Sequence, residues 1–234
     1  AVKYGTTRDY VRAMTVVLPT GEIVHLGASV SKTSSGYSLL NLMIGSEGTL
    51  GIITELTLKL IPAPKEVISL VVLYENLEDC ISTVPKLMMA NLHPQALEFM
   101  EREIVRLSES YLGKSTFPQT FEGTDVNAYL LVTFDGENED QLTEIIEQAS
   151  EVVLEAGALD VLVADTPQLK KDAWAARSTF LEAIEANTKL LDECDVVVPV
   201  NQIAHYVTYI KEISEGYDFE VKSFGHAGDG NLHI

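Results

Sequence analysis

Two histidines near the end of the sequence could bind a metal ion. His226 and His233 are separated by Ala-Gly-Asp-Gly-Asn-Leu, a segment that contains two glycines. A turn of this composition can fold two imidazoles together, and paired imidazoles bind zinc, manganese or iron at sites that keep open positions for substrate oxygens. The same spacing also fits two ordinary loop histidines, so the pattern alone predicts either half of a divalent-metal site or a simple turn.

Arg177 is the second residue that could take part in chemistry. It follows the single tryptophan, Trp174, by three residues in a segment with helical spacing. Residues three apart share a helix face, so the guanidinium could clamp a carboxylate through two hydrogen bonds while the indole forms an apolar wall. A surface arginine beside a core tryptophan would show the same spacing.

The third candidate is a glycine-rich segment that leads into an alternating, strand-like segment. Gly45, Gly48 and Gly51 lie within seven residues, directly before Ile52 and Ile53. Glycine permits backbone conformations closed to other residues and lets another group approach the main chain, which favours backbone N–H groups held against a ligand. A tight turn explains the same glycines.

Composition limits what these candidates could serve. The chain has 234 residues, of which 46% are apolar and 22% charged, and this predicts a packed core in one large or two small domains. Acidic residues outnumber basic ones by 35 to 16, which gives a net charge of −19. Such a field disfavours nucleic acid and anionic membrane surfaces, so an anionic substrate would need a local cation such as Arg177.

Cysteine usage and hydropathy indicate a protein of the reducing cytoplasm. Cys80 and Cys194 lie far apart and form no C-x-x-C pair, which favours free thiols. We find no apolar run of about 18 residues and no charged leader with an apolar core.

The periodicity predicts alternating strands and helices on either side of one boundary. Two prolines in Pro62-Ala63-Pro64 cannot continue a sheet interior, so we expect domains at 1–64 and 65–234. Strands are expected at Val11–Leu18, Glu22–Leu26, Ile52–Ile61, Ile68–Tyr74, Gln95–Met100, Ala128–Phe134, Leu159–Ala164, Asp195–Val200 and Phe219–Phe224. Helices are expected at Tyr37–Ile44, Leu77–Asn91, Glu103–Leu112, Asp140–Ala156, Pro167–Asn187 and Asn201–Glu215.

The alternation fits either a doubly wound parallel sheet or split βαβ units on an antiparallel sheet. The strands read as short and half polar, and no glycine fingerprint follows the first of them. We therefore predict an α+β fold with an antiparallel sheet.

Two strings of residues resemble one family. The pattern K-x-x-x-G-Y-x-L-x-x-L-x-x-G-S-E-G-T-L-G-I-I-T-E, over 32–55, resembles the FAD-binding segment of the flavoprotein oxidases typified by vanillyl-alcohol oxidase. It is most similar to the branch of the glycolate oxidase catalytic subunit and D-lactate dehydrogenase. The pattern G-H-x-G-D-G-N-x-H, over 225–233, resembles a second motif of that branch. The resemblance implies the C-terminal part of an FAD-binding domain at 1–64 and a ferredoxin-like cap at 65–234.

The resemblance also implies roles for particular residues. Arg177 would hold the substrate carboxylate, and His226 and His233 would hold the divalent metal. Independently of the resemblance, the positions of Asp229 and Asn231 beside the histidines fit either orientation of the imidazoles or satisfaction of the turn. Candidate contacts to FAD are Tyr4, Gly5, Gly45, Ser46, Glu47, Gly48, Gly51, Ile52, Ile53 and Asn231.

The implied activity is oxidation of a small D-2-hydroxy acid, glycolate or D-lactate, to its 2-oxo acid by hydride transfer to FAD. Asp192 and Glu193 stand where relatives that bind dicarboxylates carry a cation, which disfavours a second substrate carboxylate. The implied partners are an electron-transferring flavoprotein or an iron–sulfur subunit, and a second copy in a homodimer.

The sequence also departs from the family pattern. The first pyrophosphate-binding glycine loop is missing, as are the later Glu-His segment with the third metal ligand and the base. We therefore expect this chain alone to bind FAD weakly or not at all and to show no turnover. The alternative is a non-catalytic ferredoxin-like binding or assembly module whose glycine loops are structural. His25, His93 and His205 are expected to be structural or surface residues.

Overall fold

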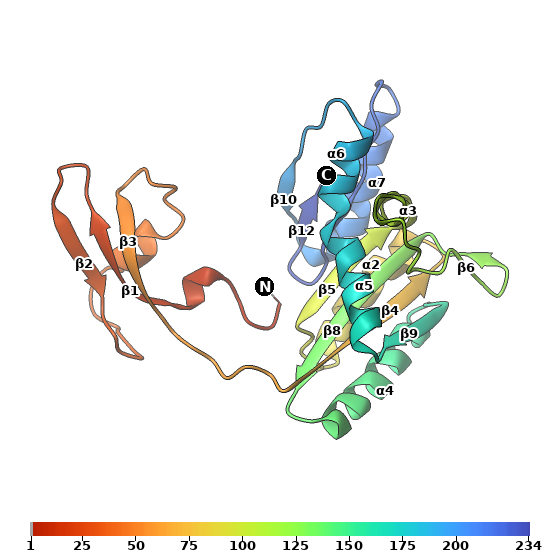
Figure 1. Cartoon of the computed structure of the whole chain (residues 1–234), viewed down its shortest axis with the longest axis horizontal. Helices are drawn as coiled ribbons and strands as arrows, with labels where there is room; N and C mark the ends of the chain where they lie inside the picture. The colour runs from red at the N-terminus through yellow and green to blue at the C-terminus, as the bar shows by residue number, and fades with distance from the viewer. Residues whose placement is uncertain (1) are drawn as a thin grey trace. The chain divides into compact units, whose positions relative to one another are not determined.

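A computed structural model describes residues 2–234, which divide into two compact units. One unit is Tyr4–Ala63, and the other is Pro64–Ile234 together with Val2 and Lys3. In Figure 1, Tyr4–Ala63 is drawn in red to orange and Pro64–Ile234 in orange to blue. Each unit has its own sheet and its own buried core.

The smaller unit is a three-stranded antiparallel sheet with the order β2-β1-β3. Its core contains only four buried apolar residues, and every residue of the edge strand β3 is exposed. Its elements are η1 (Thr7–Asp9), β1 (Val11–Val17), β2 (Ile23–Gly27), α1 (Leu39–Met43) and β3 (Ile52–Leu58).

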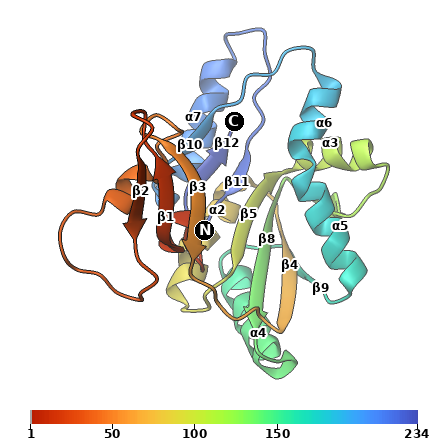
Figure 2. The same cartoon turned by 60° about the vertical axis from the view of Figure 1, so that its left-hand side comes forward.

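The larger unit is built on a seven-stranded sheet with the order β10-β12-β11-β5-β8-β4-β9, and all its pairs are antiparallel. Figure 2 shows β5, β8 and β4 side by side. The strands are β4 (Glu66–Tyr74), β5 (Ala96–Glu101), β8 (Ala128–Gly136), β9 (Asp160–Ala164), β10 (Asp195–Val197), β11 (Phe224–His226) and β12 (Asn231–His233). A small hairpin, β6 (Thr120–Phe121) with β7 (Thr124–Asp125), stands apart from this sheet.

The predicted α+β class with an antiparallel sheet is confirmed. Strands β9-β4-β8-β5, with one helix between β4 and β5 and another between β8 and β9, make the split βαβ arrangement of a ferredoxin-like unit. Strands β11, β12 and β10 extend this sheet beyond β5.

Helices cover both faces of the larger sheet, which gives three layers (Figures 1 and 2). One core lies between the sheet and α2, α4 and α7, and the other between the sheet and α3, α5 and α6. The helices are α2 (Leu77–Met89), α3 (Arg102–Leu112), α4 (Glu139–Glu155), α5 (Pro167–Ser178), α6 (Phe180–Asn187) and α7 (Ile203–Ser214), with η2 (Val200–Gln202) before α7.

One reason given for the antiparallel prediction was wrong. The central strands are not half polar, because eight of the nine residues of β8 are buried, as are the last six of β4. Strands sandwiched between two helical layers need apolar residues on both faces, whatever their direction.

Local signals start the helices where the pattern predicts. The side chains of Asn76, Asn138 and Thr166 accept hydrogen bonds from backbone N–H groups in the first turns of α2, α4 and α5. These caps satisfy N–H groups that a helix start leaves without partners.

Three predicted elements differ from the structure. The long helix at Pro167–Asn187 is interrupted at Thr179, and only Phe224 of the predicted strand Phe219–Phe224 is paired. The short strand β12 falls inside the segment read as a turn.

No helix within residues 2–234 has the length and apolar character required to cross a bilayer.

Candidate functional site

Arg177, Glu98 and His226 form one hydrogen-bonded cluster in the larger unit. Arg177 donates from Nε to Oε2 of Glu98, at 3.0 Å, and its Nη2 forms an ion pair with the same oxygen, at 2.8 Å. The other carboxylate oxygen, Oε1, lies 2.7 Å from Nδ1 of His226. Since a carboxylate bridges the arginine and the histidine, the two predicted site residues are held in fixed positions relative to each other.

Strand pairing places these side chains on one face of the sheet. Glu98 on β5 is directly paired with His226 on β11, and Asn231 on β12 is paired with His226 in turn. Side chains alternate along a strand, so Glu98 points away from the core of Leu97 and Phe99 and toward the layer of α3, α5 and α6. Residues remote in sequence therefore meet through register alone.

The break between α5 and α6 sets the position of Arg177, which is in the last turn of α5. Thr179 Oγ1 hydrogen-bonds to the carbonyl oxygens of Ala175 and Ala176, and Ser108 Oγ from α3 also donates to Ala176. Side-chain hydroxyls that bond to helix carbonyls compete with the backbone ladder and favour a bend. The predicted single helix was wrong for this reason.

Aromatic rings enclose the guanidinium of Arg177. Its Cζ lies 4.9 Å from the ring centroid of Phe224 and 5.4 Å from that of Phe180. The side chain of Arg177 is 11% exposed and that of Glu98 is 5% exposed. A cation so placed gains from the ring faces as well as from its carboxylate partner.

The turn between β11 and β12 brings the two histidines together, as their spacing indicated. The ring centroids of His226 and His233 lie 5.6 Å apart, at an interplanar angle of 77°. Two glycines permit this close pairing: a Cβ on Gly225 would lie 2.3 Å from the Asn231 carbonyl oxygen, and Gly230 has a φ of +83°. The glycines thus serve the geometry of the hairpin.

His233 has a buried ring nitrogen without a hydrogen bond. Its ring stacks on Phe224, at 5.1 Å between centroids. Glu193 Oε1 lies 3.4 Å from Nδ1 but outside hydrogen-bond geometry, so within residues 2–234 this atom has no hydrogen-bond partner. A buried, unsatisfied imidazole nitrogen is the kind of atom that a metal ion or a bound ligand would satisfy.

The separation of the two imidazoles is compatible with a shared metal ion. Rings that share one metal through bonds of about 2.1 Å have centroids roughly 5–6 Å apart, which matches the observed separation. Among the described residues no group of three or more His, Cys, Asp or Glu is placed to hold a metal ion. Within residues 2–234 the two histidines do not by themselves complete a metal site.

Glu98 was missed by the sequence analysis. A signal for it exists, because it is a carboxylate inside the otherwise apolar strand segment Leu97–Met100. Acidic residues are seldom fully buried without a partner, so a buried strand with one glutamate predicts a nearby cation or imidazole.

Other predicted residues lie close to the cluster but make different contacts. Trp174 Nε1 donates to Ser69 Oγ, at 3.3 Å, over β4 rather than β5. The Asn231 side-chain amide donates to Asp195 Oδ1 and so ties β12 to β10. Its role as a contact to FAD or as an orienting partner of the imidazoles stays a prediction.

The glycine-rich segment of the smaller unit is a tight turn in which some backbone N–H groups do not form hydrogen bonds within residues 2–234. Glu47 and Gly48 have φ angles of +52° and +75°, and Thr49 N–H donates to Ser46 O, which together describe a type I′ turn. A Cβ on Gly51 would lie 2.7 Å from Val16 Cγ1, so this glycine serves packing. Within residues 2–234 the N–H groups of Glu47 and Gly48 have no hydrogen-bond partner.

The other predicted FAD contacts also lie in the smaller unit. Gly5 has a φ of +76°, and the carbonyl oxygen of Tyr4 accepts a hydrogen bond from Tyr10 Oη, at 2.7 Å. Ile52 and Ile53 open β3 with exposed side chains. Contact of any of these residues with FAD stays a prediction.

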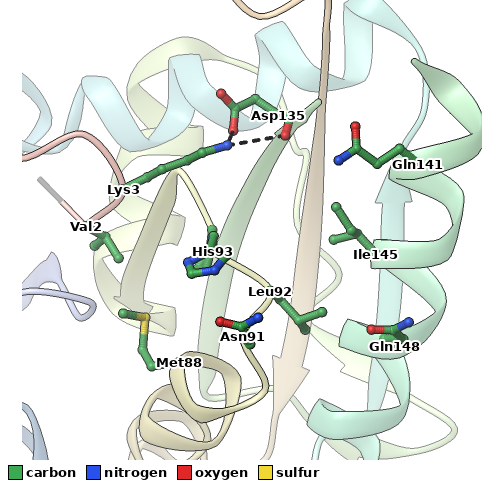
Figure 3. Close-up of a pocket in the computed structure, with 11 residues that line it drawn as sticks. Val2, Lys3, Met88, Asn91, Leu92, His93, Asp135, Gln141, Ile145 and Gln148 are labelled. Atoms are coloured by element: carbon green, nitrogen blue, oxygen red, sulfur yellow. Dashed lines mark hydrogen bonds and ion pairs between the residues drawn. The ribbon is translucent and has the colours of Figure 1, made fainter. Parts of the chain in front are cut away.

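A separate cavity of about 450 Å³ lies on the opposite helical layer of the larger unit (Figure 3). Met88, His93 and Ile145 help to line it, and Lys3 reaches Asp135 at its edge. None of the predicted site residues lines this cavity. The cluster of Arg177, Glu98 and His226, which contains a largely buried ion pair, is the stronger candidate for a functional site.

Comparison with known proteins places the chain in a family. Residues 63–234 match the family model described as "FAD linked oxidases, C-terminal domain". The chain is 75% identical over its whole length to a D-lactate dehydrogenase of Anaerostipes hadrus, of which it covers 49%. It is 37% identical over 99% of its length to the glycolate oxidase subunit GlcD of Bacillus subtilis, of which it covers 48%. The chain thus spans about half the length of these relatives.

Solved structures agree in fold. An alkyldihydroxyacetonephosphate synthase matches 99% of the chain, with a TM-score of 0.72 at 19% identity, and the chain covers 46% of that protein. A 4-ethylphenol oxidase from Gulosibacter chungangensis matches with a TM-score of 0.68 at 17% identity over 99% of the chain, which covers 52% of it. With the family model over residues 63–234 and the whole-chain identity to its relatives, these matches show that the chain belongs to the FAD-linked oxidase family and contains its C-terminal domain.

Proposed function

We propose that the protein containing this chain oxidises a small D-2-hydroxy acid, D-lactate or glycolate, to its 2-oxo acid with FAD as the hydride acceptor. The observation that supports this most is the gathering of Arg177, His226 and His233 on one face of the larger sheet. Relatives named D-lactate dehydrogenase and glycolate oxidase subunit support the substrate class. The proposal makes the chain part of an enzyme rather than a non-catalytic assembly module.

Arg177 would bind the substrate carboxylate. Its Nε and Nη2 groups are engaged by Glu98, whereas Nη1 makes no hydrogen bond to any of residues 2–234. The edge of the guanidinium that carries Nη1 can therefore donate to a second carboxylate without release of the first. The rings of Phe180 and Phe224 flank this cation and restrict water around it.

We also propose that His226 and His233 supply two ligands to a divalent zinc, manganese or iron ion. The metal would polarise the hydroxyl and carboxylate oxygens of the substrate, a base would take the hydroxyl proton, and FAD would accept the hydride from C2. The orphaned Nδ1 of His233 and the separation of the two rings support this role. The two imidazoles would orient the substrate hydroxyl relative to the carboxylate held by Arg177.

Main-chain contacts to FAD would come from the smaller unit. The type I′ turn at Ser46–Thr49 carries two N–H groups without partners, and backbone N–H groups in such turns can bind anionic oxygens. Tyr4, Gly5 and the start of β3 at Ile52 and Ile53 complete this proposed surface.

The charge around the histidines favours a substrate with one carboxylate. Asp192, Glu193 and Asp195 lie at or just before β10, whose partner strand β12 carries His233. A second carboxylate in that direction would meet acidic side chains rather than a cation. D-Lactate and glycolate satisfy this restriction, whereas a longer dicarboxylate does not.

The electron acceptor, the oligomeric state and the cellular location complete the proposal. We propose that the electrons pass to an electron-transferring flavoprotein or an iron–sulfur subunit, since one relative is a subunit of glycolate oxidase. A homodimer and a cytoplasmic location stay predictions.

The experiment uses the protein from the complete reading frame. We expect a yellow, FAD-containing preparation that reduces an artificial electron acceptor with D-lactate or glycolate and not with the L-enantiomer of lactate. Removal of divalent metal with a chelator is expected to lower the rate, and its addition to restore it.

Two outcomes would contradict the proposal. A complete protein without flavin absorbance would favour the assembly module, in which the glycine turns are purely structural. A flavoprotein that oxidises neither acid would show that the family is right and the substrate class wrong.

A further inference from the structure

We propose that Glu98 is a positioning residue that sets the tautomer of His226 and the orientation of Arg177. This inference rests on the proposed function, in which the other ring nitrogen of His226 faces a metal ion or the substrate. Glu98 lies outside both sequence motifs, and its contacts with Arg177 and His226 identify it.

The first step concerns the proton on His226. A carboxylate can only accept hydrogen bonds, so the 2.7 Å contact between Glu98 Oε1 and His226 Nδ1 requires the proton to be on Nδ1. In the neutral imidazole Nε2 then carries a lone pair. A lone pair on Nε2 is what a metal ligand or a proton acceptor needs.

Burial and pairing with Arg177 hold the Glu98 carboxylate in place beside His226. The Glu98 side chain is 5% exposed, and it is paired on its other oxygen with two N–H groups of Arg177. Burial of a carboxylate costs free energy unless the carboxylate is paired, so Glu98 and Arg177 fix each other's position. Water therefore cannot easily replace it as the acceptor for Nδ1.

The third step links the histidine to the arginine. Because Oε2 takes the Nε and Nη2 donors, the guanidinium plane is fixed, and the edge with Nη1 is presented beyond Glu98. Glu98 thus sets both the carboxylate-binding edge and the imidazole lone pair, from a single position on β5. Substrate carboxylate and hydroxyl would be held by groups that share one anchor.

Glu98→Gln tests this inference because it keeps the shape and reverses one hydrogen bond. A glutamine can still accept from Arg177 through its oxygen, and its NH₂ group then faces Nδ1 of His226 as a donor. We expect the imidazole to move its proton to Nε2, where it blocks the lone pair. Glu98→Asp keeps an acceptor and is expected to retain the wild-type tautomer with looser geometry.

The readout is the ring ¹⁵N spectrum of the complete protein at about pH 8, with the His226 signals assigned by comparison with His226→Asn. We expect a protonated Nδ1 and an unprotonated Nε2 in the wild type and the reverse in Glu98→Gln. A titration with Zn²⁺ or Mn²⁺ is expected to show a 10- to 100-fold weaker affinity in Glu98→Gln, the usual effect of losing the partner that orients a ligand histidine.

The control is Glu109→Gln, which alters another buried carboxylate of the same unit. Glu109 Oε1 accepts from the backbone N–H groups of Thr116 and Phe117 and lies outside the cluster. Its variant is expected to lose stability without any change in the His226 signals. A general effect of destabilisation would appear in both variants.

A wild-type His226 protonated at Nε2, or a Glu98→Gln variant with the wild-type tautomer and metal affinity, would overturn the inference. These readouts do not depend on turnover. If the protein oxidises no 2-hydroxy acid, the proposed function fails while the tautomer still reports on Glu98.

Discussion

Arg177 illustrates at the scale of one residue why arginine and lysine are not equivalent. It presents two N–H groups to one oxygen of Glu98, lies against Phe224, and retains a further edge of donors. A planar, delocalised cation can satisfy these requirements together, whereas an ammonium is a compact point charge. The identity of this residue therefore matters beyond its charge.

We predict that Arg177→Lys raises the KM for D-lactate or glycolate and lowers kcat/KM by about 10- to 100-fold. Loss of a hydrogen bond to a charged group costs about 1.5–3 kcal/mol, and about 1.4 kcal/mol corresponds to a tenfold change. Steady-state kinetics of the complete protein measure the effect. The matched control is Arg102→Lys, at an arginine that pairs with Asp125 away from the cluster. An unchanged KM in Arg177→Lys would show that this cation does not bind the substrate.

Glu101 carries a pH dependence of stability. Burial raises the pKa of this carboxyl, and the hydrogen bond from Lys211 opposes the shift only in part. The folded state therefore binds the Glu101 proton up to a higher pH than the unfolded state, whose pKa is about 4.3. Its contribution to stability is fully present below that value and is lost as the pH rises through the raised folded-state pKa.

We expect Glu101→Gln to remove this loss, so that the free energy of unfolding falls less as the pH rises above about 4.3, the unfolded-state pKa, than it does in the wild type. Urea unfolding at a series of pH values measures the difference. Glu137→Gln, at an exposed residue paired with Lys65 away from Glu101, serves as the control and should leave the pH dependence unchanged. Parallel pH curves for wild type and Glu101→Gln would contradict the assignment.

At the scale of the element, the hairpin of β11 and β12 converts a glycine-rich segment into a site. It is paired to β5 on one side and to β10 on the other, so both histidines enter the sheet rather than remain on a loop. A strand fixes the direction of a side chain more firmly than a loop does. This explains how His226 meets Glu98 and how Arg177 meets the same carboxylate from α5.

We predict that Gly225→Ala destabilises the larger unit by about 1–3 kcal/mol and weakens metal binding. The added methyl would lie 2.3 Å from the Asn231 carbonyl oxygen and 3.0 Å from Leu232 Cα, so β12 must move away. Denaturant unfolding and a Mn²⁺ titration measure the two effects.

Gly216→Ala is the matched control for this hairpin. A Cβ there meets nothing within 4 Å, and this glycine has no positive φ. We expect it to leave stability and metal binding close to wild type. Equal behaviour of the two alanine variants would mean that β12 is not held by the close approach at Gly225.

At the scale of the whole chain, the two units differ in how far they complete their own cores. The larger unit buries two extensive apolar clusters, whereas the smaller unit buries four apolar side chains and leaves Ile52, Leu56 and Leu58 exposed on β3. A three-stranded sheet with so small a core gains little stability from burial. The larger unit should therefore resist unfolding and proteolysis better than the smaller unit.

We predict that limited digestion with trypsin cuts first at the connection between the units, after Lys59 or Lys65. Leu60 is 87% exposed, and no regular strand or helix spans the residues between β3 and β4. The product beginning near Glu66 is expected to persist, as mass spectrometry of the digest would show. Earlier cleavage within α2 or α4 would contradict this order of stability.

How much the sequence could reveal depended on whether a feature is local. The period of two predicted most strands, the helical period and the capping residues predicted most helices, and the two glycine-rich strings indicated the family. The interruption at Thr179 escaped prediction because it depends on hydroxyl contacts with α3, a helix about 70 residues away in sequence. The hairpin β6–β7 and the strand β12 were too short for periodicity to reveal.

The sequence by itself indicated that His226 and His233 can be folded together, because a turn with two glycines lies between them. Only the tertiary structure decided that β11 lies beside β5 and that α5 packs over the same face, and so only it brought Glu98 between His226 and Arg177. Strand order depends on pairing between segments that are remote in sequence. Because side chains alternate along a strand, this pairing also decides which residues meet on one face of the sheet. A glutamate in a buried strand acquires its role from neighbours that its own stretch of sequence does not contain.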